Sequence, residues 1–101
     1  MKYGQIFTYT LELHSKDEYI KKFVDPFAQT IAGAEGLISK VWMADFDTKF
    51  SSFYLWESKE DMDHFMSSPE IKMVAGLPFI KDLKIVEIPV VIEASIITRG
   101  I

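Results

Sequence analysis

The stretch that decides the fold is Gly36–Glu57, which reads GLISKVWMADFDTKFSSFYLWE. Two apolar runs, Leu37–Ala44 and Ser52–Trp56, flank the polar segment Asp45–Lys49, which is rich in residues that form turns. Branched and aromatic side chains dominate both runs, and such side chains fit the pleated, packed surface of a sheet. The stretch is therefore predicted to be a β-hairpin with a loop of about five residues.

The segment before the hairpin predicts a strand followed by an amphipathic helix. Apolar and polar residues alternate through Gln5–Leu13, and a period of two is typical of a strand. From Ser15 to Ala34 the apolar residues recur every three or four positions, which predicts a helix with one apolar face. Pro26 is expected to kink this helix because it lacks an amide proton. Gly33 and Gly36 are expected to end it.

The segment after the hairpin completes a recognisable order of elements. Ser58 predicts the start of a second helix, which Pro69 interrupts before a further helical turn at Glu70–Ala75. Leu83–Ile97 is the most apolar stretch and is predicted to be a strand, with Pro89 restricting it to the edge of a sheet or a bulge. The order β-α-β-β-α-β predicts a ferredoxin-like α+β fold, an antiparallel sheet with helices on one face.

The length of the final strand favours a homodimer. At about 3.3 Å per residue Leu83–Ile97 would span roughly 45–50 Å. A long apolar edge strand promotes aggregation unless another chain covers it. The first and last strands also carry apolar side chains on both faces. Two copies that pack sheet against sheet and exchange strand ends would satisfy both requirements.

Size and charge restrict the classes of function. With 101 residues the chain is expected to form one domain, residues 1–101. The net charge is −4, the ten Lys residues are scattered, and Arg99 is the one Arg, so no basic stripe argues for a nucleic-acid partner. Hydrophobic residues make up 49% of the chain, which leaves apolar surface for a small ligand or a second copy.

Cysteine content and hydropathy predict the compartment. The chain contains no Cys, which removes disulfides, thiolate nucleophiles and Cys metal ligands, and which fits a reducing compartment. No apolar run approaches the ~18 residues of a membrane span. The residues Met1–Gly4 do not open a signal peptide. A cytoplasmic protein with no membrane partner is the expectation.

Several short motifs resemble a known family. These are Pro26, Glu35-Gly36-Leu37, Lys40-Val41-Trp42, and Phe53–Glu57 before a Lys-Glu-Asp helix start. Together they resemble the dimeric α+β barrel superfamily, above all its YdhR-type monooxygenases, relatives of the antibiotic-biosynthesis monooxygenases. The resemblance implies a ferredoxin-like protomer, a homodimer whose two sheets close a barrel, and a ligand cavity between each sheet and its helices. Short apolar motifs of this kind indicate fold more strongly than activity.

The sequence departs from this family at residues that carry chemistry. Members that oxygenate quinol-like aromatics or degrade haem commonly rely on an Asn, and this chain has none. Haem-degrading members place a His ligand just after the second helix, where this chain has Ile71–Ala75, which argues against haem degradation. The glycines form no phosphate-binding pattern, and no Gly-x-Ser-x-Gly elbow is present. The prediction is for no cofactor.

The two histidines give one candidate base and no metal site. His14 follows the first strand, near the expected mouth of the cavity, and could act as a general base. An exposed loop His is the alternative interpretation. His64 falls on the solvent side of the second helix, and nothing places it near His14, so no metal site is predicted. Glu87 and Glu93 interrupt the final strand as edge charges or as pocket acids, and the edge interpretation is favoured.

Aromatic residues are the best candidates for substrate binding. An indole N–H or a phenol O–H in an apolar cavity can donate to a substrate oxygen while the ring stacks on it, although such residues are also ordinary core. Pairing about the middle of Asp47-Thr48 would place Trp42 and Tyr54 on opposite faces, and a slip of one residue would reverse this. The predicted substrate-binding residues are Tyr9, Phe27, Trp42, Tyr54, Trp56 and Phe65.

These features favour a cofactor-independent monooxygenase that acts on a small aromatic or polyketide-like substrate in a cavity between sheet and helices. In this chemistry the deprotonated substrate itself passes an electron to oxygen. The activity follows from the resemblance, and the residues permit it. Two alternatives stay open, a cyclase or isomerase on the same fold and a small-ligand-binding module without catalysis.

Overall fold

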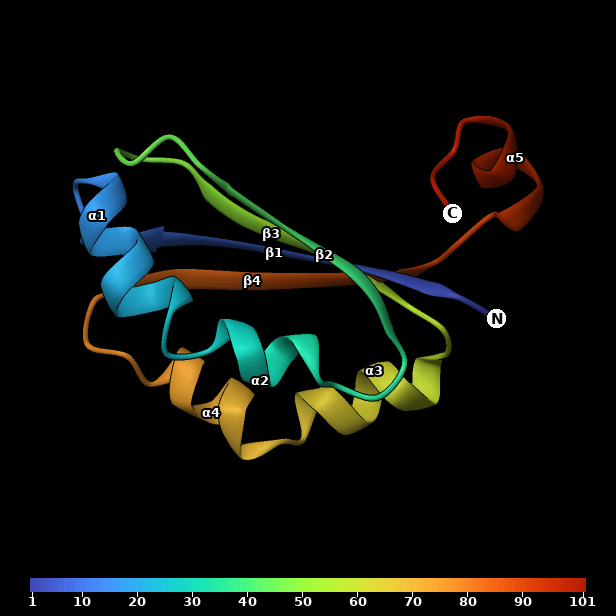
Figure 1. Ribbon diagram of the computed structural model, residues 1–101, viewed down its shortest axis with the longest axis horizontal. Coiled ribbons are helices and arrows are strands. Elements are labelled where there is room, and N and C mark those ends of the chain that lie inside the picture. The colour runs from blue at the N-terminus through green and yellow to red at the C-terminus, as the bar shows by residue number, and fades with distance from the viewer.

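The computed structural model describes residues 1–101 and contains one antiparallel sheet of four strands in the order β2-β3-β1-β4. The strands are β1 (Tyr3–Leu11), β2 (Leu37–Ala44), β3 (Phe50–Trp56) and β4 (Ile80–Pro89). The helical segments are α1 (Lys16–Tyr19), the π-helical turn η1 (Ile20–Val24), α2 (Ala28–Ala32), α3 (Lys59–Met66), α4 (Pro69–Ala75) and α5 (Ile92–Ile97). All but α5 lie on one side of the sheet (Figure 1), so the predicted ferredoxin-like α+β fold is confirmed. None of the helices has the length and apolar character needed to cross a bilayer.

The predicted first helix is present but consists of three short pieces. Ser15 caps α1, since its hydroxyl accepts the amide of Glu18 at 3.2 Å. The amide of Asp25 then donates to the carbonyl of Ile20, a bond five residues long, immediately before Pro26. Because Pro26 has no amide to continue the helix, the chain breaks here and resumes as α2. The predicted kink is therefore confirmed as a break.

The hairpin has the predicted bounds within two residues, and its register is now defined. A carboxylate oxygen of Asp45 accepts three loop amides, at 2.9–3.1 Å, and so closes the loop. Trp42 pairs with Ser52 and Lys40 pairs with Tyr54, which centres the hairpin on Asp47. Trp42 and Tyr54 therefore lie on the same face of the sheet, the face that the helices cover.

The predicted final strand, Leu83–Ile97, is wrong in extent. β4 begins three residues earlier and ends at Pro89, and the chain then turns into α5. Pro89 has no amide for a further ladder bond, and an apolar run alone does not distinguish a strand from a helix. At ten residues β4 spans about 33 Å, so the argument for exchanged strand ends no longer holds. β4 does lie at the edge of the sheet, as Pro89 predicts.

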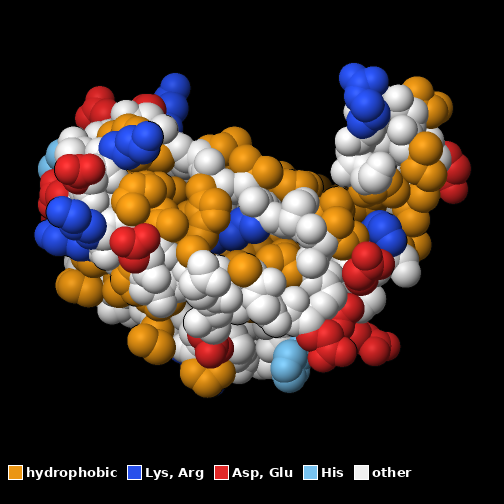
Figure 2. All heavy atoms as spheres, in the orientation of Figure 1, with side chains coloured by type: hydrophobic (Ala, Val, Ile, Leu, Met, Phe, Trp, Pro, Cys, Tyr) orange, Lys and Arg blue, Asp and Glu red, His pale blue; other side chains and the backbone are white.

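The two faces of the sheet differ in burial. Between the helices and the inner face lies a core cluster of 15 buried residues, among them Trp56 and Met62, which are fully buried. On the outer face Val41, Phe53, Ile6 and Val86 form an apolar row across all four strands, because each pairs with the next. Ile6 is 39% exposed and Val41 and Val86 are each 50% exposed. Figure 2 shows that α5 projects from the body of the molecule and that the surface between α5 and the body is concave.

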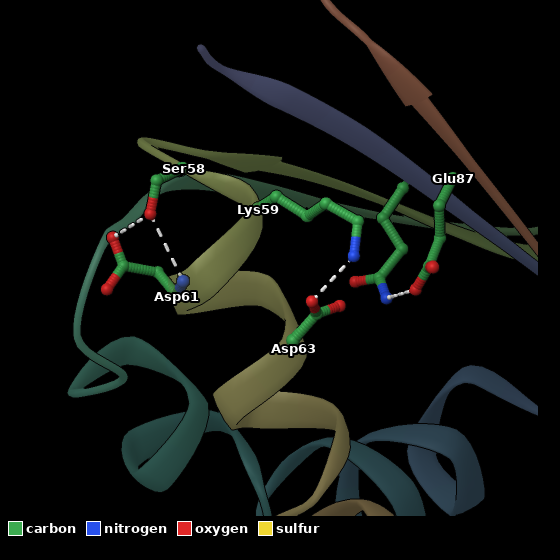
Figure 3. Close-up of polar contacts among 6 residues, drawn as sticks. Ser58, Lys59, Asp61, Asp63 and Glu87 are labelled. Carbon is green, nitrogen blue, oxygen red and sulfur yellow. Dashed lines mark hydrogen bonds and ion pairs between the residues drawn. The ribbon is translucent and has the colours of Figure 1, made fainter.

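Gly36, where the chain enters β2, is required by its conformation and by its neighbour. Its φ is +80°, and a Cβ at this position would overlap the carboxylate of Asp61. That carboxylate accepts the Ser58 hydroxyl at 2.9 Å at the start of α3 (Figure 3). Gly36→Ala is therefore expected to lower the free energy of unfolding by about 2–3 kcal/mol, measured by urea denaturation.

Gly33→Ala is the matched control for this change. Gly33 has an ordinary negative φ of −86°, and the nearest atoms to an added Cβ lie 3.7 Å away. Its substitution is expected to leave the free energy of unfolding unchanged or raised by about 0.5 kcal/mol. Equal stability of the two variants would contradict the account of Gly36.

Candidate functional site

The inner face of the sheet carries an aromatic pocket beside an open groove. The aromatic pocket has a free volume of about 10 Å³ and is lined by Tyr9, Phe23, Phe27, Ile31, Lys40, Trp42, Ser52, Tyr54 and Val74. The α2–β2 groove has a volume of about 410 Å³ and is lined by Ala28, Gln29, Ile31, Ala32, Leu37, Ile38, Ser39, Lys40 and Trp42. Ile31, Lys40 and Trp42 line both, so pocket and groove meet at these side chains. The groove is large enough for a small aromatic molecule.

The β-strand period brings the polar groups of the pocket together. Lys40 and Trp42 are two residues apart on β2, so both project to the inner face, beside Ser52 and Tyr54 of β3. The ring of Trp42 packs edge-on against Phe23, with the centroids 5.8 Å apart. Figure 2 shows Lys or Arg atoms recessed in the middle of this side of the molecule, framed by hydrophobic side chains.

Lys40 is the functional candidate that sequence reasoning missed. Its Nζ lies 3.2 Å from the ring centroid of Trp42 and 4.6 Å from that of Tyr54. None of the four ion pairs of the chain includes it. Burial lowers the pKa of Lys40 to about 7. The signal in the sequence was a single charge within the apolar run LISKVWMA.

The stability of the protein is expected to depend on pH through Lys40. The pKa of this amine is about 7 in the folded protein and 10.5 without burial, so the unfolded chain binds more protons between pH 7 and pH 10.5. The free energy of unfolding should therefore rise with pH in this window, on the order of 2 kcal/mol between pH 7 and pH 9.5. Lys40→Met should remove the rise and stabilise the protein at pH 7, whereas Lys49→Met on the exposed loop should keep the rise. Urea denaturation at several pH values measures this, and parallel curves for wild type and Lys40→Met would contradict it.

Two further donors belong to side chains that line the aromatic pocket. The indole N–H of Trp42 and the hydroxyl of Tyr54 make no hydrogen bond within the chain and are not fully buried, whereas the hydroxyls of Tyr9 and Ser52 bond each other at 2.7 Å. Burial raises the pKa of Tyr9 to about 12, and it also raises the pKa of Tyr54. Both phenols are therefore neutral donors at physiological pH.

Trp56 and Phe65 lie outside the lining of the pocket and the groove. The indole N–H of Trp56 donates to Oε1 of Gln5 at 3.0 Å, and Nε2 of Gln5 donates to Glu87 at 2.8 Å (Figure 3). The Trp56 ring stacks on Tyr54, with the centroids 5.9 Å apart and the planes 5° apart. The structure thus brings together four of the six predicted aromatic residues, Tyr9, Phe27, Trp42 and Tyr54, and places Trp56 and Phe65 behind them in the core.

The two histidines lie away from this site and from each other. His14 is exposed in the segment between β1 and α1 and lines neither the pocket nor the groove. His64 is exposed on α3. No group of three or more His, Cys, Asp or Glu side chains is placed to hold a metal ion. The base inferred from the sequence, His14, is therefore not positioned by the structure against the aromatic residues.

A second hollow of about 500 Å³ lies at the hairpin end of the sheet. This hollow is larger than the α2–β2 groove, but its walls include Thr8, Met43 and Ser51, whose side chains point to the outer face. The phenol of Tyr9, which also borders it, reaches the opposite face to bond Ser52. This hollow therefore presents no free aromatic donor, whereas Trp42 and Tyr54 supply such donors at the aromatic pocket and the α2–β2 groove, which together form the candidate site.

Comparison with known proteins identifies similar folds. The family described as "Putative mono-oxygenase ydhR" matches residues 6–101. SnoaB, a cofactor-independent oxygenase from Streptomyces nogalater, is 12% identical, with 88% of this chain and 92% of that chain covered and a TM-score of 0.70. A monooxygenase from the gene ActVA-Orf6 of Streptomyces coelicolor, in complex with nanaomycin D, is 18% identical, with 87% and 86% covered and a TM-score of 0.66. A dimeric ferredoxin-like protein of unknown function from Thermobifida fusca is 11% identical, with 89% and 92% covered and a TM-score of 0.70. No curated protein matches the sequence.

Proposed function

Because the chain belongs to the family described as "Putative mono-oxygenase ydhR", we propose that it is a cofactor-independent monooxygenase of a small aromatic or polyketide-like substrate. The substrate is proposed to lie in the α2–β2 groove against Trp42, with one oxygen directed at the aromatic pocket. The family supplies the reaction class. A neighbour of the same fold described as a cofactor-independent oxygenase supports the absence of a cofactor.

One observation carries the proposed site. The side chains of Lys40, Trp42 and Tyr54 present three donors without hydrogen-bond or ion-pair partners at one apolar, aromatic-lined place. None of these three atoms is fully buried, so a ligand can reach them and supply the missing partner. A substrate oxygen that gains negative charge during the reaction would be that partner, and fixed donors stabilise such a charge without reorganisation.

The reaction needs no external reductant when the substrate carries an activated CH₂ group. Removal of a proton gives a carbanion conjugated with the aromatic system, and this carbanion passes an electron to O₂. Oxidation of CH₂ to C=O releases four electrons, which reduce one O₂ to the new carbonyl oxygen and one water. The groove contributes a dry environment and donors for the anion.

Oxygen uptake with a panel of anthrones and quinols tests this proposal. The assay contains a chelator and no flavin, nicotinamide or metal, and heat-denatured protein measures the spontaneous oxidation. Uptake that requires folded protein supports the proposal. Binding without uptake would contradict it in favour of a ligand-binding module, and rearrangement of a substrate without uptake would contradict it in favour of an isomerase or cyclase.

The protein is further proposed to function as a homodimer in which the outer faces of two sheets pack together. The apolar row Val41-Phe53-Ile6-Val86 would be covered by its copy, and one neighbour of the same fold is described as dimeric. The protomer is 11.6 kDa, so the dimer has a mass of twice 11.6 kDa.

Ile6→Glu is expected to convert the dimer to a monomer. The substitution places a carboxylate in the middle of the apolar row, and an unpaired charge in a buried interface costs several kcal/mol. Light scattering at micromolar concentration measures the mass. Lys72→Glu, on the exposed side of α4, introduces the same side chain elsewhere and should leave the dimer intact. A wild-type protein with the protomer mass would rule out the dimer.

A further inference from the structure

We propose that Lys40 takes a proton from the substrate and then stabilises the resulting anion, so that the site selects hydroxyaromatic compounds that ionise to a phenolate or an enolate. This inference rests on the proposed function and names the substrate class and the base. It assigns chemistry to a residue that the sequence marked only as part of a family motif and not as a candidate site residue.

The position of Lys40 makes proton transfer to the ligand geometrically direct. Its Nζ lies over the ring of Trp42 and beside that of Tyr54, where the aromatic pocket and the α2–β2 groove meet. An aromatic ligand in the groove that rests against Trp42 would therefore have its ring substituents within reach of Nζ. Hydrogen-bond reach between base and proton is the first requirement for general base catalysis.

Lys40 has no acidic neighbour, which is the partner expected of a half-buried lysine that only stabilises the fold. Among the residues that line the pocket and the groove, the other titratable side chains are the phenols of Tyr9 and Tyr54, and no carboxylate faces Lys40 from β1, β3, α2 or α4. A half-buried ammonium without a counter-ion is unfavourable, and attraction to the two rings offsets this only in part. An anionic ligand would supply the missing charge.

Near neutral pH the amine of Lys40 can accept a proton from the ligand. Burial lowers the pKa of Lys40 to about 7, so a large fraction of the amine is free and can accept a proton. The transfer converts R–OH and Lys–NH₂ into R–O⁻ and Lys–NH₃⁺, and a carbon acid reacts in the same way to give its enolate. One proton moves, no electron is exchanged, and the products attract each other inside an apolar site.

The other candidate bases are engaged elsewhere. His14 is exposed and lines neither cavity. The Glu87 carboxylate accepts the Gln5 amide at 2.8 Å, and Glu93 is exposed on α5 and lines neither cavity. Lys40 is therefore the one titratable amine or carboxylate at the candidate site.

A titration of bound 1,8-dihydroxyanthraquinone tests the inference without oxygenation. Ionisation of this dye shifts its visible absorption band, and as a quinone it has no CH₂ group left to oxidise. Bound to the wild-type protein, the dye should ionise at least one pH unit lower than in water, because an opposite charge at contact distance favours the anion. With Lys40→Met the bound dye should lose this shift, and with Lys49→Met on the exposed loop it should keep it.

Lys40→Arg separates the two roles of the amine. Arginine keeps the positive charge but does not release its proton, so it can stabilise a phenolate but cannot act as the base. The dye shift should therefore persist in Lys40→Arg while oxygen uptake with the panel of anthrones and quinols falls by about 10²-fold or more at pH 7. Near-UV circular dichroism of each variant checks that the aromatic packing is retained.

The outcomes distinguish this inference from the proposed function. A wild-type protein that binds the dye without shifting its ionisation, or that does not bind it, overturns the role of Lys40. Oxygen uptake by the wild type is measured independently and decides the proposed function. Uptake that survives both Lys40→Met and Lys40→Arg would place the base elsewhere.

Discussion

Trp42→Phe is expected to lower kcat for oxygenation by about 10²- to 10³-fold, with the Kd of 1,8-dihydroxyanthraquinone changed by less than about threefold. Phenylalanine keeps an aromatic wall between the α2–β2 groove and the aromatic pocket, but it removes the indole N–H, which has no partner within the chain. A donor that acts on developing charge contributes mainly in the transition state, so its loss should affect kcat more than binding.

Trp56→Phe is the matched control for this prediction. It removes the other indole N–H of the chain, which donates to Gln5 in the core at 3.0 Å and does not reach the groove. This change should lower the free energy of unfolding by about 1–2 kcal/mol and leave kcat near the wild-type value at a temperature where the variant is folded. Similar turnover and binding in Trp42→Phe and wild type would contradict the role of Trp42, whereas weaker binding with kcat unchanged would indicate a role in ligand binding only.

Trp56→Ala is expected to lower the free energy of unfolding by about 4 kcal/mol. The side chain is fully buried, packs between Tyr54 and Phe65, and satisfies Gln5, which is itself fully buried. Alanine leaves a cavity and an unpaired amide oxygen, and both effects destabilise the folded protein. Since small domains are stable by only about 5–15 kcal/mol, much of the variant should unfold under mild denaturation.

Urea denaturation at one fixed protein concentration measures this effect, because the stability of a dimer depends on concentration. Met73→Ala provides the control, since Met73 lies on α4, away from the proposed dimer face, and is 61% exposed. Its substitution should change the free energy of unfolding of the protomer by less than about 0.5 kcal/mol. A loss below about 1 kcal/mol for Trp56→Ala would contradict the packing described for the core.

The order of elements was predictable because each signal is local. Alternation marked β1, the turn-rich segment Asp45–Lys49 marked the hairpin, and Ser15 and Ser58 marked two helix starts. The end of β4 was not predictable in this way, because an apolar run after Pro89 fits a strand or a short helix equally well. The Val90 amide still donates to the Lys2 carbonyl, a contact between distant parts of the chain, before the chain turns into α5.

The candidate site was predictable only in part, because it depends on register and on tertiary contacts. The aromatic types on β2 and β3 could be chosen from the sequence, but their shared face required the pairing of Trp42 with Ser52. Trp56 was indistinguishable from Trp42 until Gln5, far away in sequence, was found to hold its indole N–H. Lys40 was missed because a Lys within a strand is normally exposed, and only the two rings around its Nζ reveal the difference.

The fate of labelled oxygen tests most directly whether this chain is a monooxygenase. Anthrone is incubated with the protein under ¹⁸O₂, with a chelator and without added cofactor, and the product is analysed by mass spectrometry against a heat-denatured control. The proposed reaction predicts that each product molecule carries one ¹⁸O atom and that labelled product forms faster than in the control. In Trp42→Phe the rate of labelled product formation should fall by the same factor as kcat. Product without ¹⁸O, or labelled product at the rate of the denatured control, would contradict it.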